Sequence, residues 1–274
     1  MLAQRADWPG PVEIILFDDG SGEEIRKLNR PLGAQPGVRY HGGAQRGPRR
    51  HPQPGGRGLG APGVAAAARQ RQPAARRQVF ARYAAARHQA PLLIGGTSYA
   101  PLPPADTALH LRWLYGHSRE ARPAAVRQQA PHAQLTINNV LMHADILARF
   151  PLDEQLNGYG HEDTTFGLAL AAARIDVFHL DNPVLHAGLE PAAAFLQKSE
   201  EAVHNLVQAF RDGGVAIDSR LLRLALRLRK LRLATPTRVA LAAIEPPLRR
   251  NLLSATPRLQ AFDMLKLRWL LKLL

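Results

Sequence analysis

The stretch PLLIGGTS at residues 91–98 decides the predicted fold. Its apolar run is typical of a buried strand, and Gly95-Gly96 allows another part of the backbone to approach closely. Runs of similar character predict further strands at residues 12–17, 135–141 and 175–180. Helical patterns alternate with them at residues 80–88, 145–149, 162–173 and 192–211. This alternation predicts an α/β domain, in which ligands bind at the carboxyl ends of the strands.

Two local predictions accompany this framework. Residues 109–115 fit either a helix or an irregular aromatic segment. Ser21 is a suitable N-cap for a helix that begins near Glu23, because Glu23 and Glu24 would then lie in the first turn, where the helix dipole favours them.

No aspartate or glutamate occurs between Glu24 and Asp106, a window that holds 14 of the chain's 36 Lys and Arg residues. The remaining basic residues balance the 22 acids, so the formal net charge of +14 comes from this window. Residues 41–79 are nearly all Ala, Arg, Gly, Pro and Gln, which bury too little apolar surface to offset the entropy cost of ordering. The window as written therefore predicts a disordered basic insert within a globular sequence.

Bulk composition narrows the class of protein. The 274 residues are 46% hydrophobic and include no cysteine, which excludes disulfides and thiolate metal sites. No run reaches the roughly 20 apolar residues of a membrane span, and residues 1–5 lack the apolar core of a signal peptide. The basic window lacks the interleaved aromatics of a nucleic-acid platform. We therefore expect a cytoplasmic protein and do not expect nucleic acid as its partner.

From Arg220 onward, leucines alternate with cations through residue 230, and residues 265–274 repeat this pattern. Both segments predict amphipathic basic helices. One interpretation is a helical cap with solvated arginines. The other is peripheral attachment to an anionic membrane surface, at the inner face of the cytoplasmic membrane, where apolar burial and cation attraction add. The pattern leaves both interpretations open.

Three polar patterns carry the candidate chemistry: DDGS at residues 18–21, TINN at 136–139 and GYGHED at 158–163. Each alone has an ordinary structural explanation. An Asp-Asp-Gly-Ser sequence is common in turns, and Glu-Asp at a helix start interacts favourably with the helix dipole. A single histidine such as His186 more often has a structural role than a ligand-binding one.

The order and spacing of these patterns favour a functional interpretation. Together with GG at 95–96, LRWLYG at 111–116, RE at 119–120 and NPVLH at 182–186, they resemble family 2 glycosyltransferases with the GT-A fold. The resemblance covers residues 12–40 and 80–206, extends weakly to 248–253, and is most specific at 158–167. It implies a Rossmann-like GT-A sheet with flanking helices over residues 1–218, followed by an amphipathic basic helical region over 219–274.

The implied reaction moves a sugar, with inversion, from a nucleotide-diphosphate sugar to a glycan or lipid-linked acceptor, as in bacterial cell-envelope polysaccharide synthesis. Such a transfer needs a carboxylate base for the acceptor hydroxyl. Asp163 matches that base, and Glu162 matches a residue that orients the acceptor. Asn138, Asn139 and Trp113 match the acceptor-binding part of the family pattern.

The resemblance also implies a donor site. Asp18 and Asp19 match the turn that contacts the nucleotide, and Mn²⁺ or Mg²⁺ is expected on an Asp-x-Asp motif, assisted by His186. That motif should end a strand between residues 21 and 95, within the acid-free window, and it is absent. We therefore expect little or no transferase activity from the polypeptide as written.

One hypothesis is that residues 42–79 are translated in the wrong frame. Started one base later, suitable codons for residues 47–54 can spell Gly-Arg-Ala-Ala-Ile-Arg-Asn-Arg. With the same offset, residues 64–78 can spell five leucines followed by Asp-Asn-Asp-Ser-Leu-Leu-Pro-Asp-Gly-Arg, an apolar strand that ends in an Asp-x-Asp motif. The family's first strand and helix are also not matched here, which suggests truncation.

Two alternatives stay open. As an alternative to the reading-frame hypothesis, residues 42–79 are a genuine low-complexity insert. As an alternative to the enzyme, the chain is a non-catalytic binding protein that uses this basic segment to bind anionic membrane or nucleic acid.

Overall fold

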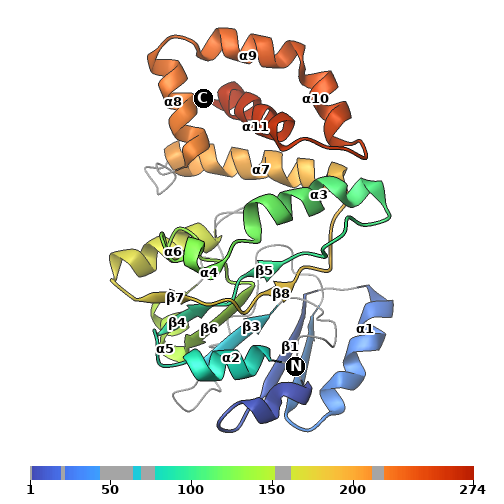
Figure 1. Cartoon of the computed structure of the whole chain (residues 1–274), viewed down its shortest axis with the longest axis vertical. Helices are drawn as coiled ribbons and strands as arrows, with labels where there is room; N and C mark the ends of the chain where they lie inside the picture. Colours follow the sequence, from blue (N-terminus) through green and yellow to red (C-terminus); the bar gives the residue numbers. More distant parts are fainter. Residues whose placement is uncertain (1, 20–21, 44–63, 69–77, 152–161, 212–218) are drawn as a thin grey trace.

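The computed structural model describes residues 2–19, 22–43, 64–68, 78–151, 162–211 and 219–274 (Figure 1). Its largest sheet has four strands in the order β3-β6-β4-β7, with β4 parallel to β7 and antiparallel to β6, and β6 antiparallel to β3. These strands are β3 (Val64–Ala68), β4 (Leu92–Ile94), β6 (Asn139–His143) and β7 (Val177–His179). The predicted mixture of strands and helices is confirmed.

Strand β4 continues beyond a glycine pair into β5 (Thr97–Ser98), which pairs in parallel with β8 (Val184–Leu185). The predicted strand 91–98 is thus divided at Gly95-Gly96, where Gly96 adopts a positive φ of 83°. A Cβ on Gly95 would overlap the Asn139 side-chain amide. The expectation that these glycines permit close backbone approach is confirmed.

Helices cover both faces of this sheet. Leu92 and Ile94 pack with Ile146 of α5 (Ala144–Arg149) and with Phe166 of α6 (Glu162–Ala172). Leu93 points to the opposite face, as alternation along a strand requires. There it packs with Val79 and Tyr83 of α2 (Val79–Ala86). The predicted helices at 80–88, 145–149 and 162–173 are therefore confirmed within one or two residues.

Two sequence-based predictions about strands differ from the structure. Strand β6 begins at Asn139 rather than at residue 135. The Ile137 backbone N–H donates to Asp163 instead of to a neighbouring strand, so the strand begins after this residue. Residues 64–68 were expected to be disordered, and this expectation is wrong because they form β3, pairing along their whole length with β6. Backbone pairing orders this segment although its composition does not favour a strand.

The N-terminal part forms a sheet of its own. Strands β1 (Ile14–Asp19) and β2 (Val38–Gly43) pair in parallel, and neither is hydrogen-bonded to the other described strands. Around them lie α1 (Glu23–Asn29) and the 3-10 turns η1 (Leu2–Asp7) and η2 (Arg30–Ala34). Helix α1 begins at Glu23 as predicted, but its N-cap is Gly22 and not Ser21. The single sheet expected from the resemblance is divided here into separate sheets.

Residues 107–127 connect the sheet to the C-terminal helices. They form η3 (Thr107–Leu109), α3 (His110–Tyr115), the π-helical turn η4 (Gly116–Glu120) and α4 (Ala124–Arg127). The segment 109–115, for which two structures were open, is thus helical. Residues 158–161 of the GYGHED motif lie outside the described residues.

The C-terminal region packs around one central helix. Figure 1 shows α8, α9 and α10 arranged around α11, with α7 between this group and the rest of the chain. These helices are α7 (Ala192–Arg211), α8 (Arg220–Lys230), α9 (Ala234–Ala243), α10 (Glu245–Leu252) and α11 (Leu259–Leu273). Phe262, Leu265 and Trp269 of α11 are each at most 2% exposed. Helix α11 is therefore the core of a helical cap.

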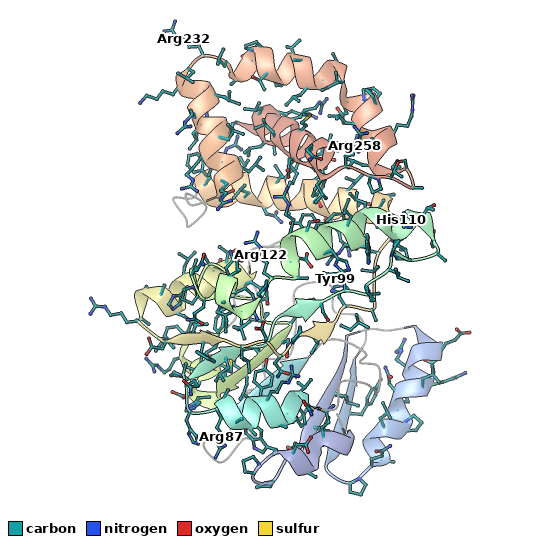
Figure 2. The ribbon with its side chains drawn as sticks, viewed as in Figure 1. Arg87, Tyr99, His110, Arg122, Arg232 and Arg258 are labelled. Atoms are coloured by element: carbon teal, nitrogen blue, oxygen red, sulfur yellow. The ribbon has the colours of Figure 1, made fainter. Side chains whose placement is uncertain are left out.

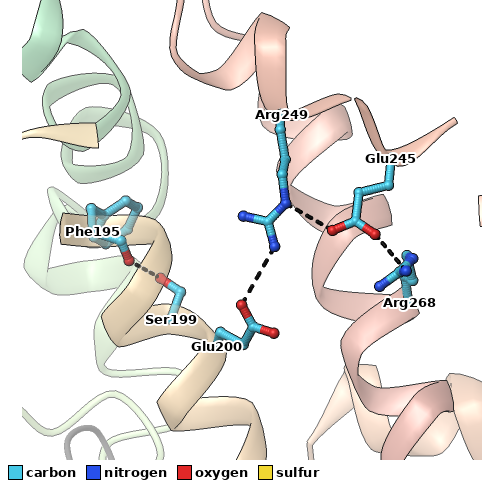
Figure 3. Close-up of polar contacts among 6 residues, drawn as sticks. All are labelled: Phe195, Ser199, Glu200, Glu245, Arg249 and Arg268. Carbon is cyan, nitrogen blue, oxygen red and sulfur yellow. Dashed lines mark hydrogen bonds and ion pairs between the residues drawn. The ribbon is translucent and has the colours of Figure 1, made fainter. Parts of the chain in front are cut away.

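An ion-pair network fastens α10 to its neighbours (Figure 3). Glu245 accepts from Arg249 Nε at 2.7 Å and pairs with Arg268 Nη2 at 2.5 Å. Arg249 also reaches Glu200 of α7 at 3.5 Å. Among the helices that the structure describes, none is long and apolar enough to cross a membrane.

Candidate functional site

Two of the predicted site residues, Asp163 and Asn138, take part in hydrogen bonds at the adjacent positions 137 and 138, just before β6. The Ile137 backbone N–H donates to Asp163 Oδ1 at 3.2 Å, and the next residue, Asn138, donates its amide to Thr97 Oγ1 at 2.7 Å. Asp163 lies in the first turn of α6, and Thr97 begins β5. Residues 137 and 138 are thus hydrogen-bonded to α6 and to β5, respectively, two elements that lie far apart in the sequence.

Asn138 keeps an unused acceptor at this place. Its Oδ1 atom is buried and has no hydrogen-bond partner among the described residues. A buried carbonyl oxygen without a donor is costly, so such an atom calls for an explanation. A hydroxyl or amide donor from a bound ligand would satisfy it.

Asn139 is positioned differently from Asn138. It is 1% exposed, and its amide nitrogen donates to the carbonyl oxygens of Gly96 at 2.9 Å and Asn182 at 2.8 Å. Its Oδ1 accepts from the Tyr83 hydroxyl at 3.0 Å. All of its side-chain heteroatoms thus have protein partners. In this structure Asn139 holds the glycine pair and the Asn182 turn in place.

A second cluster surrounds His186, the residue that directly follows β8. The imidazole stacks on the Tyr99 ring with centroids 5.3 Å apart and 13° between the planes. The Tyr99 hydroxyl donates to Glu120 Oε2, which also accepts from Arg112 Nη2 at 3.2 Å. The Arg112 guanidinium lies 5.4 Å from the centroids of both the Tyr99 and the Phe195 rings. The cluster therefore joins the end of the sheet, α3, η4 and α7.

Burial and charge set the protonation states in this cluster. Burial, reinforced by the Arg112 cation, lowers the pKa of His186, so its imidazole is neutral at neutral pH. Burial and the Glu120 carboxylate raise the pKa of Tyr99, which keeps its hydroxyl protonated as the donor to Glu120. Glu120 belongs to η4, and π-helical turns of this kind occur frequently at functional sites.

Trp113 lies on α3, and its indole N–H donates to the Ala100 carbonyl oxygen at 2.8 Å. The same oxygen bonds His117 Nε2 at 2.7 Å, and the Trp113 and His117 rings are 4.6 Å apart. Trp113 is half-buried next to the chain that leaves β5. The structure thus places it near the Tyr99 cluster through His117, whose ring is 5.8 Å from that of Tyr99.

The remaining predicted residues are placed by their backbone only. Asp18 and Asp19 end β1 and pair with Gly42 and Gly43 of β2. Glu162 is the first residue of α6. The side chains of these three acidic residues lie outside what the structure describes. The position of the Asp pair at the carboxyl end of a parallel strand agrees with the predicted element.

A donor set for Mn²⁺ or Mg²⁺ is not assembled within the described part of the chain, where no group of three or more His, Asp or Glu side chains converges. His186 lies beside the Arg112 cation, which would repel a metal ion. The described residues therefore do not fit the expected metal.

No protein-family model matches the sequence, and no curated protein matches it significantly.

The sequence analysis assigned no role to Arg127, nor to Tyr99, Arg112 and Glu120 of the His186 cluster. Arg127, 5% exposed, donates to the carbonyl oxygens of Ile94 at 3.2 Å and Leu180 at 2.9 Å. It also bonds His179 Nδ1 at 2.6 Å. Tyr99, Arg112 and Glu120 were likewise without a role, although Arg112 and Glu120 lie in motifs that carry the resemblance. The signal that could have identified Arg112 is its place among the apolar residues of the segment 111–115.

Proposed function

We propose that the chain is derived from an inverting family 2 glycosyltransferase of GT-A architecture, with an intact acceptor half and an incomplete donor half. The observation that carries this proposal is that Asp163 bonds the Ile137 backbone, while the next residue, Asn138, bonds Thr97 beyond the carboxyl end of β4. Ligands of α/β sheets bind at such ends. Asp163, from the most specific motif of the resemblance, thereby bonds the residue two positions before Asn139, 26 residues away in the sequence.

In the proposed reaction, Asp163 takes the proton from an acceptor hydroxyl. The hydroxyl oxygen then bonds to the anomeric carbon of the donor sugar, while the bond from that carbon to the nucleoside diphosphate breaks. The Ile137 N–H orients the carboxylate, and the unused Asn138 Oδ1 accepts a hydrogen bond from a sugar hydroxyl. Peripheral membrane association is consistent with a lipid-linked acceptor.

Strand β3 supports the reading-frame hypothesis. It spans Val64–Ala68, the same five codons that spell five leucines in the shifted frame. The Asp-Asn-Asp sequence would follow directly, at residues 69–71. An apolar strand next to β6 is therefore compatible with the backbone arrangement.

The test compares the chain as written with a chain that carries the shifted-frame sequences at residues 47–54 and 64–78. Both are supplied with a panel of nucleotide-diphosphate sugars and Mn²⁺ or Mg²⁺, and release of nucleoside diphosphate is measured. We expect release only from the restored chain. Release from neither chain with any donor would overturn the proposal, and metal-dependent release by the chain as written would contradict its expected inactivity.

Within the restored chain, Asp163→Asn tests the base. We expect it to lower the rate by about 10² to 10⁴-fold. Asp145→Asn is the matched control, because Asp145 also lies in the first turn of a helix, α5, and is exposed. Equal effects of the two substitutions would remove Asp163 from the catalytic role. Sequencing the coding DNA through codon 83 tests the reading-frame hypothesis directly.

A further inference from the structure

The end of the helical cap farthest from the sheet exposes apolar side chains. This tip surface consists of α9 and the turns that join it to α8 and α10. Figure 1 shows α9 on the opposite side of the cap from α7. Its exposed apolar residues and their exposed fractions are Leu231 (59%), Leu233 (47%), Val239 (59%) and Ile244 (42%).

Cations occupy the same surface. Arg229 and Lys230 end α8, Arg232 lies in the turn that follows, and Arg238 lies on α9, and all four are exposed. In Figure 2, Arg232 extends outward from this end of the molecule. Its φ of 60° belongs to the left-handed region that allows the sharp turn between α8 and α9.

No carboxylate offsets these charges locally. Residues 219–244 include seven Arg and Lys residues and no acidic residue. Glu245, the next acid along the chain, is already engaged by Arg249 and Arg268. Considering only described residues, the four tip cations form no ion pairs.

We propose that the tip surface binds an anionic lipid membrane, with the apolar residues entering the interface and the cations contacting lipid headgroups. Apolar burial and cation attraction add in such a contact. Nucleic acid would be attracted by the cations but would leave the four large apolar side chains without a role. The proposal does not rest on the transferase assignment.

Co-sedimentation of the full chain with vesicles tests the charge component. We expect binding to vesicles of phosphatidylcholine with phosphatidylglycerol and little binding to phosphatidylcholine alone. The triple variant Arg229→Gln, Arg232→Gln, Arg238→Gln should weaken binding on the order of a hundredfold, because each cation near an anionic surface contributes about fivefold. A matched control removes the exposed charges of Arg82, Arg149 and Arg174 and should leave binding within a few-fold of the starting value.

A pair of valine substitutions tests the orientation. Because the chain has no cysteine, a single Cys can be labelled with an environment-sensitive fluorophore. Val239→Cys at the tip should show a blue shift on addition of anionic vesicles. Val126→Cys, on α4 and 44% exposed, should show none.

Three results would overturn the proposal. The first is vesicle binding that the tip variant leaves intact and that deletion of residues 42–78 abolishes. The second is equal fluorescence shifts at residues 126 and 239. The third is binding to duplex DNA, lost in the tip variant, without binding to anionic vesicles.

Discussion

The sheet and the helical cap are stabilised by different means. The sheet is tied together by buried polar groups, in particular Arg127, Asn139 and His179, each at most 5% exposed. The cap is held by apolar packing of α11, with Trp269 and Phe262 in its core. The comparison teaches that sequence patterning was enough to locate α7, α8 and the C-terminal part of α11, whereas the polar network around the site depends on contacts between distant segments.

The largest effect is expected in the cap. Trp269→Ala removes a side chain that is 2% exposed and should lower the free energy of unfolding by about 3–5 kcal/mol. Urea unfolding followed by circular dichroism measures this change. Trp113→Ala, which alters a half-buried indole outside the cap core, is the control and should cost less. Equal losses would show that α11 is not the main core of the cap.

In the sheet, Arg127→Met keeps the side-chain length but removes its hydrogen bonds. The carbonyl oxygens of Ile94 and Leu180 would lose a buried donor, for an expected loss of about 2–4 kcal/mol by the same measurement. Arg82→Met serves as the control, because Arg82 is exposed and bonds one carbonyl, that of Asp181. If both variants were equally stable, polar contacts would not be what holds the sheet.

The ion-pair network of α10 should contribute less. Glu245→Gln keeps the shape but leaves Arg249 and Arg268 without their shared carboxylate, and about 1–2 kcal/mol should be lost. Glu201→Gln, on an exposed face of α7, should change stability by less than about 0.5 kcal/mol. If Glu245→Gln lowered the free energy of unfolding more than Arg127→Met does, ion pairs would stabilise the cap as strongly as apolar packing does.

The pH dependence should be the smallest effect and should arise in the sheet. Burial lowers the pKa of His179, whose protonated form would also face Arg127. The unfolded chain therefore takes up this proton at about pH 6.5 while the folded chain does not. The stability that His179 contributes is complete above that pH and is lost as pH falls through the lower folded pKa, by at most about 1.4 kcal/mol per pH unit.

His179→Gln should flatten this acid-side slope, measured as the free energy of unfolding between pH 5 and 8. His186, whose pKa burial also lowers, retains its own part of the slope. An unchanged slope in the His179 variant would place the titrating group elsewhere. An overall loss of stability without flattening would indicate that only the bond to Arg127 had been removed.

Local signals in the sequence were sufficient to locate many helices and strands, but not those that depend on pairing or bonding between distant segments. The apolar run at 91–94 and the periodicity of residues 192–211 and 220–230 located β4, α7 and α8. Strand β3 could not be predicted, because alanine has little strand preference and its order comes from pairing with β6. The start of β6 was missed because a long-range bond from Ile137 to Asp163 replaces a ladder bond.

The candidate site was predictable only in part. The motif spacing named Asp163 and Asn138, and the structure bonds Asp163 to the backbone of the residue before Asn138. The same reasoning treated Asn138 and Asn139 alike, although one has an unused acceptor and the other is fully bonded. Adjacent residues in an Asn pair differ in environment according to the strand register, which single-sequence patterns do not specify.

Helix α8 connects the tip surface to α7, which packs beside the His186 cluster through Phe195. Its 11 residues correspond to about 16 Å of helix. If the tip surface binds a bilayer, the length of this helix sets the distance between the sheet and the lipid headgroups. Under the proposed function, an acceptor anchored in the same bilayer would then be selected by its length, because shorter glycans could not reach Asp163.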